Sequence, residues 1–60
     1  MKLEIGTWYR LKEGFGPFPF GVKMMKFVGR SGQDWPCFEN EYRGKKAMLN
    51  AVDDTFEIAV

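Results

Sequence analysis

The sequence contains no histidine and only one cysteine, Cys37. Without a second thiol the chain cannot form an internal disulfide, and it lacks the ligand set of an ordinary zinc site. It also lacks the imidazole that most often serves as a catalytic base near neutral pH. We therefore expect no metal and no cofactor, and a stability that depends on hydrophobic packing.

Long apolar runs and a strong net charge are missing too. No stretch approaches the ~18 apolar residues that a membrane span needs. Residues 1–5 alternate in polarity, unlike a signal peptide. The formal net charge of +1 is too small to produce a strong electrostatic attraction between the whole molecule and nucleic acid. Together with the single free cysteine, these absences predict a cytoplasmic protein that has no membrane partner.

Nucleophiles and paired acids are present but lack catalytic surroundings. Ser31 lies in an expected turn with no base to activate it, and Cys37 is expected to be a small buried hydrophobic residue. The acid pairs 39/41 and 53/54 are expected to be solvated turn charges and a helix cap, because a glycosidase pair needs a cleft between its carboxylates. The sequence therefore predicts no catalytic residue and no enzyme.

What the chain does have is aromatic surface in a small domain. Its 60 residues are predicted to form one domain, 1–60, with 45% hydrophobic and 17% aromatic residues. Glycine and proline interrupt every helical repeat, which is typical of an all-β domain. Short strands are expected at 6–12, 20–30, 35–39, 45–52 and 57–60, with one helical turn over 53–56 before the last strand.

Several positions constrain these strands further. Tyr9 and Leu11 share one face of the first strand. The alternation of the second strand breaks, which predicts a bulge near Met24 and Met25 or a strongly bent strand that serves two sheets. Pro36 belongs at a strand start or at an edge, since proline cannot donate to a ladder. Residues 45–52 could form a helical turn by propensity, but their short length favours a strand.

Both ends of the chain carry short motifs. Residues 5–12, IGTWYRLK, fit the pattern hydrophobic-Gly-x-x-Tyr-Arg-hydrophobic, and residues 53–58, DDTFEI, form a turn followed by a strand. These motifs resemble the opening strand and the closing turn of small bacterial and bacteriophage SH3-like proteins. The resemblance implies a five-stranded SH3-like barrel and a phage-encoded protein that docks on a host protein. The signalling SH3 motifs are absent and Trp35 precedes Pro36, so proline-rich peptide binding is not implied.

The segment 14–21, GFGPFPFG, places three phenylalanines where neither a helix nor a regular strand can form. Its glycines allow tight turns and its prolines stiffen the chain. The expected core already contains seven other side chains: Tyr9, Leu11, Val22, Phe27, Leu49, Phe56 and Ile58. Some loop rings are therefore expected to stay exposed. Alternatively, the loop folds over the open end of the barrel as a lid. Exposed rings and a lid are compatible if one ring points inward and another outward.

A protein-binding surface is the function that the surplus of rings predicts, because exposed aromatic patches mark interaction sites. The expected contact residues are aromatic anchors with two cations at the rim: Trp8, Phe15, Phe18, Phe20, Trp35, Arg10 and Lys12. The expected partner is a host or cognate protein, and self-association through the same rings is a related possibility.

Single-stranded nucleic acid is the alternative partner. Lys23, Arg43, Lys45 and Lys46 could form a basic face, with Trp8 available for base stacking. The near-zero net charge favours the plainer interpretation, in which these lysines protect a sheet edge from aggregation.

Overall fold

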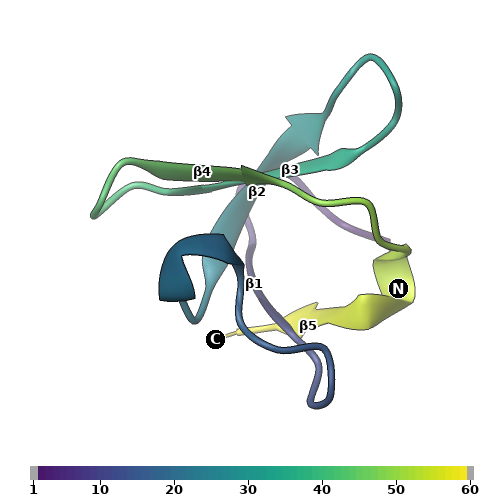
Figure 1. Cartoon of the computed structure of the whole chain (residues 1–60). Coiled ribbons are helices and arrows are strands. Elements are labelled where there is room, and N and C mark those ends of the chain that lie inside the picture. The colour runs from purple at the N-terminus through teal and green to yellow at the C-terminus, as the bar shows by residue number, and fades with distance from the viewer. Residues whose placement is uncertain (1, 60) are drawn as a thin grey trace.

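Each of the five short strands places at least one apolar or aromatic side chain in the interior, while other residues of the strand face outward. The computed structural model describes residues 2–59. Its elements, labelled in Figure 1 where there is room, are β1 (Trp8–Leu11), η1 (Pro19–Gly21), β2 (Met25–Arg30), β3 (Pro36–Asn40), β4 (Lys45–Met48), η2 (Asp53–Thr55) and β5 (Phe56–Ile58), where η denotes a 3₁₀ turn.

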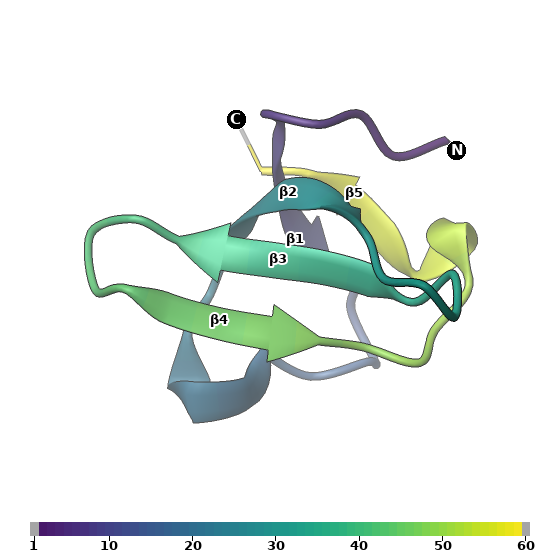
Figure 2. The ribbon, with the colours of Figure 1, turned by 90° about the horizontal axis from the view of Figure 1, so that it is seen from above.

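The strands form one antiparallel sheet in the order β4-β3-β2-β1-β5. In Figure 1, β3 and β4 lie above, β1 and β5 lie below, and β2 runs diagonally between the two halves. Figure 2 shows β3 and β4 side by side with β2 crossing behind them. The bend brings the inner faces of the two halves together. Within residues 2–59 no pairing joins the edge strands β4 and β5, so the sheet is open and a closed barrel stays a prediction.

A bulge in β2 marks the bend. Lys26 pairs with Glu39, whereas Gly29 pairs with Cys37, so β2 contains one residue more than β3 at Val28. Gly29 has a φ of 132°, a conformation that a residue with a side chain rarely adopts. The bulge expected near Met24 and Met25 therefore lies further along the strand. The alternative was a strongly bent strand that serves two sheets. β2 is strongly bent, but it belongs to one sheet and does not serve two.

The strands are shorter than the sequence patterns indicate. Residues 45–52 begin as a strand, as predicted, but β4 ends at Met48. Pro36 opens β3, where its missing N–H costs no ladder bond. The expected aspartate cap of η2 is wrong, since η2 has no side-chain cap. The Asp53 carboxylate instead accepts a hydrogen bond from Arg30 Nη2 at 2.5 Å. The last position of the expected strand 57–60 lies outside the described residues.

Five aromatic rings fill the space between the two halves of the sheet. Phe38 is central, with ring centroids 4.9 Å from Phe56, 5.0 Å from Phe18, 5.5 Å from Phe27 and 6.5 Å from Tyr9. All five are buried. Each such ring contributes about 1.5–3 kcal/mol of burial.

Smaller buried side chains complete the core: Leu3, Val22, Met25 and Ala47. Three partly buried side chains pack against it: Leu11, Leu49 and Ala51. Of the expected core, Ile58 is misplaced: it is 52% exposed because it lies near the end of edge strand β5. Cys37 is half-buried rather than buried, because its side chain lies on the outer face of β3.

Candidate protein-binding site

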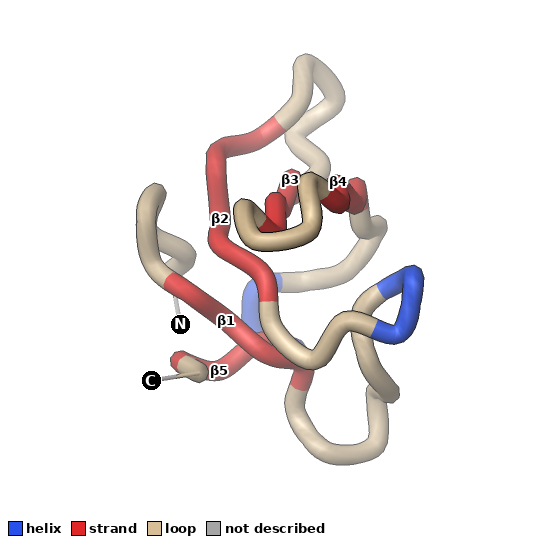
Figure 3. Tube along the Cα trace, turned by 90° about the vertical axis from the view of Figure 1, so that its left-hand side faces the viewer, coloured by secondary structure: helices blue, strands red, loops and turns tan. Residues whose placement is uncertain are grey.

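The loop between β1 and β2 swings away from the strands, and Figure 3 shows η1 near its far end. Phe18 enters the core, with an exposed fraction of 1%. Its backbone N–H donates to the Val22 carbonyl oxygen at 3.1 Å, which closes the loop around η1. Phe15 and Phe20, on either side of Phe18, are 59% and 63% exposed. The loop is therefore both a lid on the core and a carrier of exposed rings.

An apolar pocket of about 380 Å³ lies between this loop and the chain that follows β4. Its lining combines the end of β1, loop rings and the segment before η2: Leu11, Phe15, Pro17, Pro19, Leu49, Asn50 and Ala51. Leu11 and Leu49 also pack against the core, so the pocket floor is continuous with the rigid interior. The two prolines fix the backbone of the loop wall, which limits the entropy lost when a ligand binds.

A second pocket, of about 260 Å³, lies on the other side of η1 and is basic. It is lined by Gly21, Val22, Lys23, Met24, Asn40 and Arg43. Asn40 Nδ2 donates to the Met24 carbonyl oxygen at 3.4 Å, and Asn40 Oδ1 accepts from the Arg43 backbone N–H at 3.1 Å. One asparagine thus joins both walls of the basic pocket.

Phe20 lies in the chain between Pro19, which lines the apolar pocket, and Gly21, which lines the basic pocket. The Lys45 ammonium lies 5.1 Å from its ring centroid, a cation–π contact. The Phe20 backbone is left-handed, with a φ of 69°, which is unfavourable for a residue with a side chain. Such strain persists where the surrounding structure fixes the backbone, and the buried neighbours Phe18 and Val22 do so here.

The outer face of the sheet carries paired charges. Trp8 is half-buried and lies opposite Lys26, which forms an ion pair with Glu41. Arg10 Nε lies 3.3 Å from a carboxylate oxygen of Glu57 on the neighbouring strand. Because Trp8 and Arg10 alternate with the inward Tyr9, they point away from the core and from the apolar pocket floor.

Trp35 belongs to the β2–β3 loop and is 39% exposed. Its backbone N–H donates to Ser31 Oγ at 3.2 Å and its carbonyl accepts from the Ser31 N–H at 2.9 Å, so Ser31 holds this turn. Nearby, Arg30 binds Asp53 and connects the end of β2 to η2. That hydrogen bond stabilises the charged guanidinium and raises the pKa of Arg30 above its ordinary value.

The predicted contact residues do not form one surface. Phe15 lines the apolar pocket and Phe20 is exposed next to the pocket residue Pro19, but Phe18 is buried and offers no surface to a partner. Phe18 is therefore the ring that points inward, Phe15 and Phe20 are the rings that stay exposed, and the arrangement with one ring inward and another outward is the one observed. Lys12 is exposed, and its backbone N–H donates to Thr55. The remaining predicted contacts, Trp8, Arg10 and Trp35, lie on the outer face of β1 and in the β2–β3 loop.

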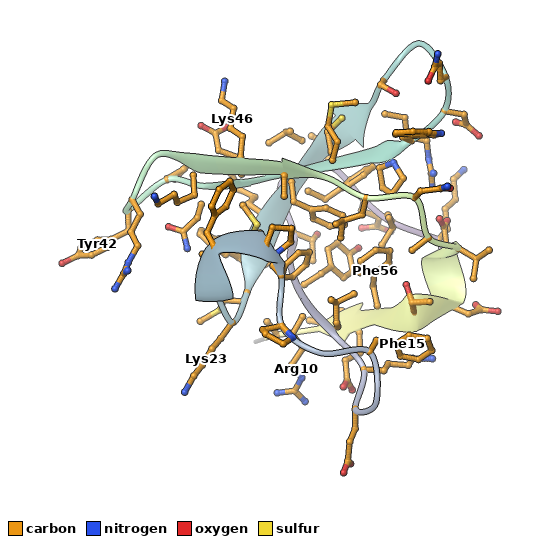
Figure 4. The ribbon with its side chains drawn as sticks, in the orientation of Figure 1. Arg10, Phe15, Lys23, Tyr42, Lys46 and Phe56 are labelled. Carbon is orange, nitrogen blue, oxygen red and sulfur yellow. The ribbon has the colours of Figure 1, made fainter. Side chains whose placement is uncertain are left out.

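The basic set also divides. Lys23 and Arg43 share the basic pocket, and Lys45 reaches Phe20 beside it. Lys46 pairs with Glu39 on the outer face of β4, and Figure 4 shows Lys46 and Lys23 pointing in opposite directions. The nucleic-acid face expected from these residues and Trp8 is therefore split between two sides of the sheet.

Sequence reasoning missed much of the pocket lining. Pro17, Pro19 and Leu49 were expected only as loop stiffeners or core, and the apolar pocket arises because the loop and the β4–η2 segment meet. Tyr42, at 92% exposed, was also missed. A signal was available, because an aromatic residue inside the turn 40–44, NEYRG, has no strand neighbour to cover it.

Comparisons with protein-family models, with curated proteins and with solved structures found no match to this chain. Over residues 2–59, neither 3₁₀ turn has the length or apolar character needed to cross a membrane. In the same range, no three histidine, cysteine or acidic side chains gather as metal ligands would. The candidate site is therefore defined by its geometry alone.

Proposed function

We propose that this chain is a small non-enzymatic protein-binding module and that the apolar pocket is its docking site. One observation carries the proposal. Phe15 is 59% exposed at the edge of a preformed apolar pocket, whereas Phe18, three residues away, is 1% exposed in the core. An exposed ring beside an apolar pocket has the features of an interface anchor.

The pocket fits an extended polypeptide segment better than a small polar substrate. Its walls are proline, leucine, alanine and phenylalanine side chains, with Asn50 as the one polar side chain among its lining residues. Apolar side chains of a partner would displace water from these walls, and Asn50 could accept or donate one hydrogen bond to the partner backbone.

The finer fold proposal is an SH3-like barrel. It is supported by the long loop after β1, the strongly bent β2, the tight turn after β3 and the 3₁₀ turn before β5. We further propose that the partner is a host protein and that the chain is phage-encoded and cytoplasmic. The host partner and the phage origin rest on the resemblance of residues 5–12 and 53–58 to small SH3-like proteins, and the cytoplasmic location rests on the single free cysteine.

Affinity capture with matched variants tests the docking role. Wild-type protein, Phe15→Ser and Ile5→Ser are immobilised and exposed to bacterial lysate. Ile5 is 74% exposed and does not line the apolar pocket, so Ile5→Ser removes a comparable amount of exposed apolar surface elsewhere. We expect a protein retained by wild type and by Ile5→Ser and lost by Phe15→Ser. Equal retention by all three baits would refute the proposed site.

A further inference from the structure

The two pockets flank η1 and are connected through it. Pro19 lines the apolar pocket and Gly21 lines the basic pocket, and these residues are two apart in the chain. Their Cα atoms are therefore at most about 7 Å apart. An extended polypeptide advances about 3.3 Å per residue, so a segment of about five residues can reach from one pocket into the other. Phe20 lies at the crossing.

The basic pocket has cations that lack internal partners. Lys23 and Arg43 line it and Lys45 lies over Phe20, and none of the three forms an ion pair among residues 2–59. The acid in the adjoining turn, Glu41, is already bound to Lys26 from β2. A carboxylate that enters the basic pocket therefore meets the positive charges of Lys23 and Arg43 without displacing an internal acid.

We propose that the basic pocket extends the docking site and binds an aspartate or glutamate of the partner. The partner segment thus carries apolar side chains for the apolar pocket and an acidic side chain a few residues away. This inference rests on the proposed protein-binding role and adds the chemistry of the partner. The planar guanidinium of Arg43 can form two parallel hydrogen bonds to such a carboxylate.

The rigidity of η1 supports one continuous site. Phe20 keeps a left-handed backbone, and Gly21 follows with a φ of 72°. The hydrogen bond from the Phe18 N–H to the Val22 carbonyl oxygen holds both ends of this turn. A partner that crosses η1 therefore meets a ring in a fixed position, and little conformational entropy is lost at the crossing.

A polypeptide fits this surface better than a single-stranded nucleic acid. Nucleic acid would need cations along its whole path, whereas the apolar pocket has no charged side chain in its lining. Lys46 and Trp8, which would extend a basic and stacking surface, lie on the outer face of the sheet. The formal net charge of +1 is also low for a nucleic-acid-binding domain.

A displayed library of random 12-residue peptides provides the probe. Peptides selected on wild-type protein are sequenced, and the most enriched is synthesised together with a version in which each acidic residue is replaced by its amide. Dissociation constants are measured by fluorescence anisotropy against wild type, Arg43→Gln and Lys46→Gln. Lys46→Gln is the matched control, because it also removes one exposed positive charge. Lys46 is three residues after Arg43 in the chain, but it lies on the outer face of β4 and does not line the basic pocket.

We expect selected peptides that combine apolar residues with an acidic residue. Arg43→Gln should weaken binding of the acidic peptide about tenfold or more, because the substitution removes the charge-assisted hydrogen bonds of the guanidinium. Lys46→Gln should change its affinity less than about twofold, and Arg43→Gln should leave the amide version unaffected.

Other outcomes would overturn the inference in distinguishable ways. The selected peptides could be apolar with no enrichment of acidic residues and still bind Phe15→Ser more weakly than wild type. That result would refute the acidic contact and leave the proposed function standing. An absence of any selected peptide would count against both. A thymidine oligonucleotide that binds more tightly than the selected peptide and is released by Arg43→Gln would replace the peptide with nucleic acid.

Discussion

Replacing Phe18 with alanine removes the ring that the β1–β2 loop inserts into the core. The Phe18 centroid lies 5.0 Å from Phe38 and 6.2 Å from Phe56, and the side chain is 1% exposed. Truncating a fully buried phenylalanine costs about 3–5 kcal/mol. A domain of 60 residues has a total unfolding free energy of only about 3–9 kcal/mol. Phe18→Ala is therefore expected to remove most of the stability.

Urea unfolding followed by tryptophan fluorescence measures the effect, with Phe15→Ala as the matched control on the same loop. Phe15 is 59% exposed, so its truncation is expected to cost less than about 1 kcal/mol. If Phe18→Ala is too unstable to analyse, Phe18→Leu leaves most of the volume in place and is expected to cost about 1–2 kcal/mol. The reasoning is refuted if Phe15→Ala costs as much as Phe18→Ala, or if Phe18→Leu is neutral.

Three further substitutions, one of them with a matched glycine control, test other parts of the fold by the same unfolding measurement. Phe20→Gly should change the unfolding free energy by less than about 1 kcal/mol, because relief of the left-handed backbone offsets lost ring contacts; a loss above about 2 kcal/mol would contradict this. Tyr9→Phe should cost about 1 kcal/mol, since the Tyr9 hydroxyl accepts a hydrogen bond from the Glu4 N–H at 2.9 Å; no change would show that water replaces it. Gly29→Ala should cost about 1–3 kcal/mol because of the bulge backbone, whereas Gly32→Ala, with open space and no positive φ, should be nearly neutral; equal costs would exclude strain as the cause.

The strand content and the orientation of β1 could be predicted from local pattern. Alternation placed Tyr9 inward, and short length favoured a strand where Lys45–Met48 indeed pairs with β3. Local pattern could not place the bulge. An extra residue anywhere in β2 restores the alternation, and its position depends on which residues of β3 align with it.

The choice among the three loop phenylalanines was also beyond sequence reasoning. Their local environments are nearly identical, each flanked by glycine or proline. What separates Phe18 from Phe15 and Phe20 is contact with Phe38 and Phe56, which are at least 20 residues further along the chain. Composition did predict that the core could not take every ring, and Phe15 and Phe20 are exposed.

Solvent access to individual phenylalanine rings tests the docking proposal most directly. Protein labelled with fluorophenylalanine is examined by ¹⁹F NMR with a soluble paramagnetic agent, and the resonances are assigned with single phenylalanine-to-leucine variants. In the free protein, the agent is expected to relax Phe15 and Phe20 strongly and Phe18 very little. A saturating amount of the partner protein identified by affinity capture should protect the Phe15 and Phe20 rings from relaxation by the agent. Unchanged relaxation of both rings in the complex would contradict docking at this surface.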